Sequence, residues 1–177
     1  MNEPSKWISP FSGSETMKRC SVLSPQFLDE VEKLLDRFYD MTGVTIVMLI
    51  DVSGQLISYK GNPYNVNLSN LAALIAGDMA AVNEMARQIG EPDRFKLLFH
   101  EGENHIILIS ALKGSFLLVS IFKTSVQIGL VRLFTKETMI RLMRIIEEIG
   151  ASDQVEQIVD ASFTTSLADE LERAFGE

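Results

Sequence analysis

The sequence predicts an α+β domain of three layers, in which helices cover both faces of an antiparallel β-sheet. Three segments repeat apolar residues with the spacing of an amphipathic helix, and five shorter β-branched or aromatic runs are bounded by turn residues. These elements follow one another in the order αββαβββα. A sheet of this kind needs cover on both faces, and three helices can supply it in an α/β/α arrangement.

The chain has the length of one ordinary domain with extensions. It has 177 residues, of which 46% are hydrophobic, enough to bury a sizeable core. We predict a flexible leader at 1–24, a domain at 25–150 and an acidic amphipathic tail at 151–177. The tail repeats apolar residues every four positions, which fits either a solvated tail or a helix that docks on the domain or on a partner. Its acidic residues, set against Arg173 alone, are Asp153, Glu156, Asp160, Asp169, Glu170, Glu172 and Glu177.

Composition argues against several classes of protein. The net charge of −8 speaks against nucleic acid as the main partner, because phosphate binding needs a basic face. The longest apolar runs are too short to span a bilayer, so we expect no membrane insertion, and the N-terminus lacks the long apolar region of a secretory signal. Cys20 is the only cysteine. A disulfide framework is therefore not expected, and the predicted location is the cytoplasm.

The first helix is predicted from Pro25 to about Met41. Ser24 suits the N-cap and Pro25 the first helical position. Apolar residues then recur at helical spacing until Gly43, which ends the helix.

A β-hairpin is predicted next. A β-branched strand at 44–50 leads through a turn at 51–54 into a second strand at 55–60. The first of these strands is apolar on both faces, which places it in the centre of its sheet. Asp51 is expected to cap the backbone of the turn and not to act as a base.

The segment from Leu68 to Ile89 predicts a long helix with two unlike sides. One side is an apolar stripe, and the opposite side carries small residues where a solvent-facing helix normally carries Glu, Lys and Gln. Gly77 within a helix costs about 1 kcal/mol relative to alanine and usually has a packing reason. The segment is therefore either an Ala-rich helix chosen for propensity or a helix contacted on both sides. The stripe comprises Leu68, Leu71, Ile75, Met79, Val82, Ala86 and Ile89, and the small residues are Ala73, Ala76, Gly77 and Ala80, with polar character only at Asn83, Glu84 and Arg87.

Three further strands and a last helix complete the predicted domain. The strands lie at about 95–100, 106–112 and 116–122, and the short turns between them indicate an antiparallel meander. The last helix is predicted from about 124 to 149.

No catalytic motif is found. Neither G-x-x-x-x-G-K-[ST] nor G-x-G-x-x-G occurs, so the chain is not itself a P-loop GTPase, and we predict no catalytic site and no cofactor. His100 and His105 flank a turn that holds two glutamates, but histidines beside a hairpin turn are usually solvated and no metal is expected. Arg87 and Arg132 are the best candidates for contacts to an acidic partner, although solvated surface arginines are an equally good interpretation.

With these elements in order, the chain resembles the Roadblock family, the dynein-light-chain-like domains that regulate or anchor small GTPases. The resemblance covers roughly residues 25–149. The matching segments are GVTIVMLIDVSGQLIS (43–58), LSNLAALIAGDMAAV (68–82), KLLFHEGENHIILISALKGSFLLVSIF (96–122) and VQIGLVRL (126–133).

This resemblance implies a fold of the Roadblock/profilin type with a five-stranded sheet of order 2-1-5-4-3. It also implies a homodimer in which the third strands pair edge to edge while the central helices lie side by side. Phe95, Leu97 and Phe99 would alternate along that edge strand, and an exposed strand of this sort is a pairing template. The small face of the central helix would pack on its twin or on a partner.

The resemblance also implies a function. Bacterial members of the MglB type pair with a Ras-like GTPase and accelerate GTP hydrolysis as a dimer, without inserting an arginine finger. We therefore expect a GTPase regulator, in the first place an activator. The alternatives are a non-catalytic scaffold of the same family and a small-ligand sensing domain.

Overall fold

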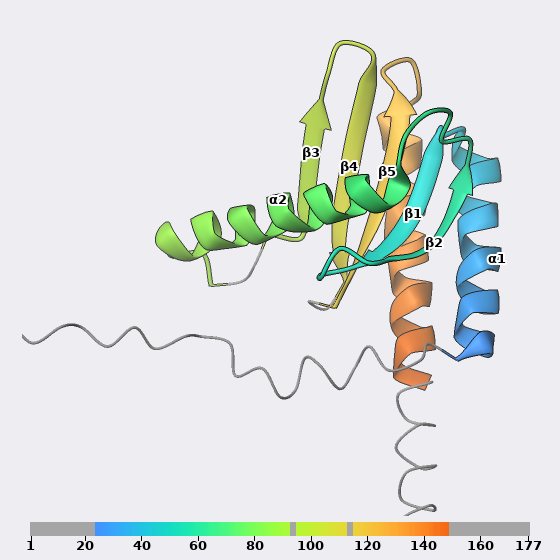
Figure 1. The fold of residues 1–177 in the computed structure, drawn as a ribbon, viewed down its shortest axis with the longest axis horizontal. Helices are drawn as coiled ribbons and strands as arrows, with labels where there is room; N and C mark the ends of the chain where they lie inside the picture. Colours follow the sequence, from blue (N-terminus) through green and yellow to red (C-terminus); the bar gives the residue numbers. More distant parts are fainter. Residues whose placement is uncertain (1–23, 93–94, 113–114, 149–177) are drawn as a thin grey trace, which may run out of the picture.

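The computed structural model describes residues 24–92, 95–112 and 115–148, and within these ranges three helices flank one β-sheet (Figure 1). Helix α2 (Leu68–Gln88) lies on one face of the sheet, and α1 (Pro25–Thr42) lies on the other face beside a helix at residues 128–148, here called the last helix. The predicted order αββαβββα and the three-layer arrangement are confirmed. Apart from Ser24, the predicted leader and the predicted tail lie outside the described residues.

The sheet has five antiparallel strands in the order β2-β1-β5-β4-β3, as the resemblance implies. Strand β1 lies between β2 and β5, and all of its residues are buried, which confirms the prediction of a strand that is apolar on both faces. The two edges are β2 and β3. The strands are β1 (Ile46–Asp51), β2 (Leu56–Gly61), β3 (Leu97–Glu101), β4 (His105–Leu112) and β5 (Phe116–Lys123).

Helix α1 begins and ends as its sequence predicts. The Ser24 hydroxyl accepts a hydrogen bond from the amide of Phe27, and Pro25 occupies the first turn. Gly43 adopts the left-handed conformation at the C-cap and donates its N–H to the carbonyl of Tyr39. The helix buries its apolar face in a core that it shares with one face of the sheet and with the last helix.

An acidic side chain closes the turn between β1 and β2. The carboxylate of Asp51 is buried and accepts hydrogen bonds from the Ser53 amide at 2.9 Å, the Ser53 hydroxyl at 2.7 Å and the Gln55 amide at 2.8 Å. These contacts satisfy backbone donors that the turn would otherwise leave unpaired. The predicted role of Asp51 as a turn cap is confirmed.

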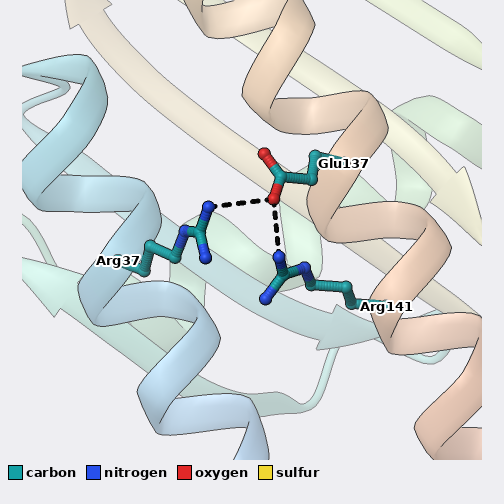
Figure 2. A network of polar contacts seen from close by, with 3 residues as sticks. All are labelled: Arg37, Glu137 and Arg141. Atoms are coloured by element: carbon teal, nitrogen blue, oxygen red, sulfur yellow. Dashed lines mark hydrogen bonds and ion pairs between the residues drawn. The ribbon is translucent and has the colours of Figure 1, made fainter.

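Helix α1 and the last helix lie side by side and are joined at their surface by one carboxylate (Figure 2). Glu137 accepts a hydrogen bond from Arg37 of α1 at 3.0 Å and from Arg141 of its own helix at 2.8 Å. Because all three side chains are partly exposed, the cluster contributes little to stability. The apolar core beneath it, which includes Val131 and Leu142, holds the two helices on the sheet.

Three predicted boundaries differ from the structure. The last helix begins at residue 128 and not near 124, because β5 continues to Lys123, which pairs with His105, and residues 123–126 then form a turn. Helix α2 ends at Gln88, and Ile89 is an exposed C-cap residue, not part of the buried stripe. Strand β3 begins at Leu97, so Phe95 precedes the strand and is only half buried.

Position 61, at the end of β2, requires glycine because the backbone of Thr45 approaches it closely. Its φ is +116°, and a Cβ at this position would lie 2.2 Å from the carbonyl oxygen of Thr45. We expect Gly61→Ala to lower the free energy of unfolding by more than about 2 kcal/mol, since both the backbone conformation and the contact would have to change. Urea unfolding followed by circular dichroism measures this change.

Gly129 provides the control for this prediction. A Cβ there would meet nothing within 4 Å, and its backbone is not in the left-handed region. Gly129→Ala should therefore leave the unfolding midpoint unchanged or raise it slightly. Equal stability of the two variants would contradict the packing described for Gly61.

No helix in the described ranges combines the length and the hydropathy that crossing a membrane requires.

Candidate protein interaction surface

Helix α2 has an inner side that packs on the sheet and an outer side that is open. The inner side contributes Leu68, Ala72, Ile75 and Met79 to a core with one face of β1, β4 and β5. On the outer side Ala73, Gly77 and Ala80 are exposed. The predicted side of small residues therefore exists on α2, with one exception.

The exception is Ala76, which is only 7% exposed. A helix turns about 100° per residue, so Ala76, eight residues after Leu68, lies about 80° from it around the helix axis. That angle places Ala76 at the margin of the buried stripe and not opposite it. The prediction that Ala76 belongs to the outer side is wrong, and a bulky substitution there would disturb the core.

Two large apolar residues on the outer side were not predicted. Leu74 is 71% exposed and Met85 is 58% exposed. They are eleven residues apart, about three helical turns, and therefore lie on the same side of α2. Their spacing was a usable signal, because both fall outside the buried stripe although both are apolar. Together with the small residues they make this side of α2 apolar.

Gly77 has no packing reason within the described chain. A Cβ added there would meet no atom within 4 Å. By contrast, a Cβ on Gly54 in the β1–β2 turn would lie 2.8 Å from the Cα of Ala73, so the turn packs closely against the start of α2. Glycine in the middle of a helix costs about 1 kcal/mol relative to alanine. The close packing at Gly54 therefore requires glycine, whereas the packing within the described chain does not require glycine at Gly77.

Strand β3 lies next to α2 and forms one edge of the sheet. His100 of β3 contacts the carboxylate of Asp78 of α2 at 2.7 Å. Leu97 and Phe99 point to the opposite face, because they pair with Ser110 and Leu108, and Leu108 belongs to the core under α1. Both Leu97 and Phe99 are exposed. The β3 edge is thus bordered by apolar side chains on both faces of the sheet.

The outer edge of β3 offers unpaired backbone groups. In an antiparallel pair, residues alternate between those that bond to the partner strand and those whose N–H and C=O point away from it. Ala111 donates to the carbonyl of Lys96, and Gly102 donates to the carbonyl of His105. This alternation directs the N–H groups of Leu97, Phe99 and Glu101 to the free edge, where β4 does not use them.

We call this region the α2–β3 surface. It consists of the exposed residues Leu74, Gly77, Ala80, Ala81 and Met85 of α2 and of the free edge of β3 with Leu97 and Phe99.

The two predicted arginines do not share a surface. Arg87 is at the end of α2 and forms an ion pair with Glu84, whereas Arg132 is exposed on the last helix, which lies on the opposite face of the sheet. Only Arg87 and Glu84 therefore adjoin the α2–β3 surface. His100 contacts Asp78 as described, and within the described ranges no three His, Cys, Asp or Glu side chains form a group that could hold a metal ion.

The Arg87–Glu84 pair makes a testable electrostatic prediction. A hydrogen bond from the Arg87 guanidinium lowers the pKa of the Glu84 carboxyl. The pair therefore stabilises the fold above the ordinary pKa of a glutamate, and this contribution is lost as the pH falls through the lowered pKa. We expect Arg87→Gln to raise the pKa of Glu84, as measured by NMR titration of its carboxyl carbon. An unchanged pKa would show that the pair does not form in solution.

Comparisons with known proteins place the fold in a family. A model of the Roadblock/LC7 domain matches residues 30–122. MglB of Myxococcus xanthus is 33% identical with a TM-score of 0.68, over 72% of this chain and 95% of that one. A structure of MglB with a tetrameric arrangement is 30% identical with a TM-score of 0.67, over 72% and 95% of the two chains.

A curated relative is also similar in sequence. An uncharacterized protein of Aquifex aeolicus (strain VF5) is 24% identical over 105 residues, which cover 59% of this chain and 65% of that protein, slightly less than two thirds of its length. The domain match extends from within α1 to the end of the sheet and takes in α2 and β3. The chain belongs to the Roadblock/LC7 family.

Proposed function

We propose that this chain is a homodimeric regulator of a Ras-like small GTPase, and that it accelerates GTP hydrolysis. The observation that carries the proposal is the α2–β3 surface, where exposed apolar side chains adjoin an unpaired strand edge. A free edge of this kind is a template for pairing with another chain, and a contiguous exposed apolar area marks an interaction site. Membership of the Roadblock/LC7 family supports a GTPase as the partner.

The first occupant of this surface is a second copy of the chain. Two β3 edges can pair antiparallel about a twofold axis, which makes the contact self-complementary. On one face of the joined sheet, the small residues Gly77, Ala80 and Ala81 let two α2 helices approach closely. On the other face, Leu97 and Phe99 of the two copies come together. The MglB structure with a tetrameric arrangement supports self-association.

The proposed acceleration does not need an arginine from this chain. Arg87 is the only arginine in α2 and β3, and it is paired with Glu84. GTP hydrolysis depends on positioning the attacking water and on stabilising charge on the phosphates. A regulator can therefore raise the rate by ordering the water-positioning residue and the arginine of the GTPase itself.

Binding to the Ras-like GTPases of the host, each loaded with GDP or with a non-hydrolysable GTP analogue, tests the partner class. We expect calorimetry to show tighter binding to the analogue-loaded form. Met85→Asp should weaken dimerisation or GTPase binding, whereas Met41→Asp on α1 should not, although the two methionines are similarly exposed at 58% and 53%. If no GTPase binds in either nucleotide state, or if the chain is a monomer at micromolar concentration, the proposal is wrong.

A further inference from the structure

The last helix has an exposed apolar strip on the side that faces away from the sheet. Leu133 and Ile140 are 62% and 49% exposed. They are seven residues apart, which is two helical turns, so they lie on the same side of the helix. Three exposed cationic side chains, Arg132, Lys136 and Arg144, lie beside them. With Ile140 these cations form a row at four-residue spacing along the helix.

The basic side chains beside this strip form no ion pair among the described residues, although Glu147 and Glu148 follow Arg144 by three and four residues. Glu137 is held by Arg37 and Arg141 (Figure 2). In the described ranges no ion pair involves Arg132, Lys136 or Arg144. The strip therefore combines apolar area with unpaired positive charge, and it fits an occupant that is apolar and acidic.

The chain itself contains such a segment directly after the last helix. Residues 151–177 carry seven acidic residues and one arginine. Their apolar residues recur every four positions, at Val155, Val159, Phe163, Leu167, Leu171 and Phe175. Residues 128–148 extend over about 30 Å at 1.5 Å per residue, and a helix of the length of the segment would extend over about 40 Å. After a short connection, the segment is long enough to run back along the whole strip.

We propose that residues 155–175 dock on this outer side of the last helix of the same chain. The apolar residues of the segment cover Leu133 and Ile140, and its carboxylates neutralise Arg132, Lys136 and Arg144. Tethering favours this occupant over a separate molecule, because the segment is held at high local concentration. The net charge of −8 disfavours the main alternative for an apolar and basic helix face, an anionic membrane surface. The inference is independent of the proposed GTPase function.

Zero-length carbodiimide cross-linking of the full chain tests the contact, because it joins a lysine amine only to a carboxylate that it touches. We expect Lys136 to couple to a carboxylate of residues 153–172. A mixture of unlabelled and ¹⁵N-labelled protein separates links within one chain from links between chains. Links within one chain support the proposal, whereas links only between chains, or none from Lys136 to the segment, overturn it.

Proteolysis tests the apolar part of the contact. Chymotrypsin should cut the unaltered chain slowly after Phe163, and the double substitution Leu133→Ser with Ile140→Ser should increase this rate about tenfold or more by releasing the segment. Met41→Ser, at another exposed apolar position, is the matched control and should leave the rate unchanged. Equal cleavage in all three proteins overturns the proposal.

A charge-reversal variant and a membrane-binding experiment complete the test of the docked segment. Lys136→Glu changes only an exposed side chain, so it also tests the contact if the double variant does not fold. It should speed the cleavage after Phe163, and high salt should do the same in the unaltered chain because salt screens these charges. Co-sedimentation with phosphatidylserine vesicles tests the alternative that this strip binds an anionic membrane surface. Binding of the unaltered chain to the vesicles through this strip would overturn the proposal.

Discussion

A chain that carries Gly77→Arg is expected to be a folded monomer under conditions in which the unaltered chain is a dimer. The free chain has room for the new side chain, since a Cβ at Gly77 meets nothing within 4 Å. Replacing a mid-helix glycine also favours the helix itself. A long charged side chain in the middle of the α2–β3 surface, however, keeps a second α2 at a distance. We expect the dimer dissociation constant to rise at least about thirtyfold, or ~2 kcal/mol.

Sedimentation equilibrium measures this effect, and thermal unfolding checks that the variant is folded. Ser69→Arg is the matched control, because Ser69 is exposed in the first turn of α2, about 12 Å along the helix from Gly77, and is not part of the α2–β3 surface. This control should dimerise like the unaltered chain. A Gly77→Arg chain that still dimerises with the original dissociation constant would show that α2 is not at the contact.

A second large effect is expected from Phe99→Pro on the β3 edge. Proline has no N–H, and the N–H of Phe99 points away from β4, so the fold loses no hydrogen bond of the β3–β4 ladder. Proline is tolerated in edge strands for this reason. A dimer that pairs two β3 edges would lose a backbone hydrogen bond on each copy and the contact of the aromatic ring. We expect the dimer dissociation constant to rise at least as much as it does in Gly77→Arg.

Phe99→Val separates the backbone effect from the loss of the ring. Valine keeps the N–H and suits a strand, so this variant should weaken the dimer much less than proline does. Size-exclusion chromatography with light scattering over a dilution series compares the two. If valine and proline weaken the dimer equally, the β3 edge contributes only side-chain packing and the proposed strand pairing is wrong.

Local chemistry explains why much of the fold was predictable from the sequence. Ser24 and Gly43 are capping residues with one preferred place in a helix, and Asp51 satisfies the turn that follows it. Strand β1 is apolar on both faces and is buried on both faces. In each case, the neighbouring residues in the chain determine the structure.

The errors arose where distant parts of the chain decide the outcome. The start of the last helix depends on how far β5 continues in its pairing with β4, up to Lys123 opposite His105, and the local pattern does not contain this information. Ala76 lies only about 80° around the helix from Leu68, at the margin of the apolar stripe, and whether this margin is buried depends on how deeply α2 sits on the sheet.

The candidate site was predictable only in part. Alternation along β3 separates Leu97 and Phe99 from His100, but it does not say which face α2 covers. The spacing of Leu74 and Met85 already puts both outside the apolar stripe, but only the packing of α2 on the sheet shows how exposed they are. The small residues of α2 and the edge position of β3 were expected, and the structure adds that apolar side chains border this edge on both faces of the sheet.

Multiple-turnover GTP hydrolysis by the Ras-like GTPases of the host tests the central claim most directly. Each GTPase is measured alone, with the unaltered chain, with Gly77→Arg and with Ser69→Arg. We predict that the unaltered chain and Ser69→Arg accelerate hydrolysis by one of these GTPases, and that Gly77→Arg does not. A GTPase that binds the dimer and hydrolyses GTP at its unaided rate would contradict an activator and would indicate a scaffold.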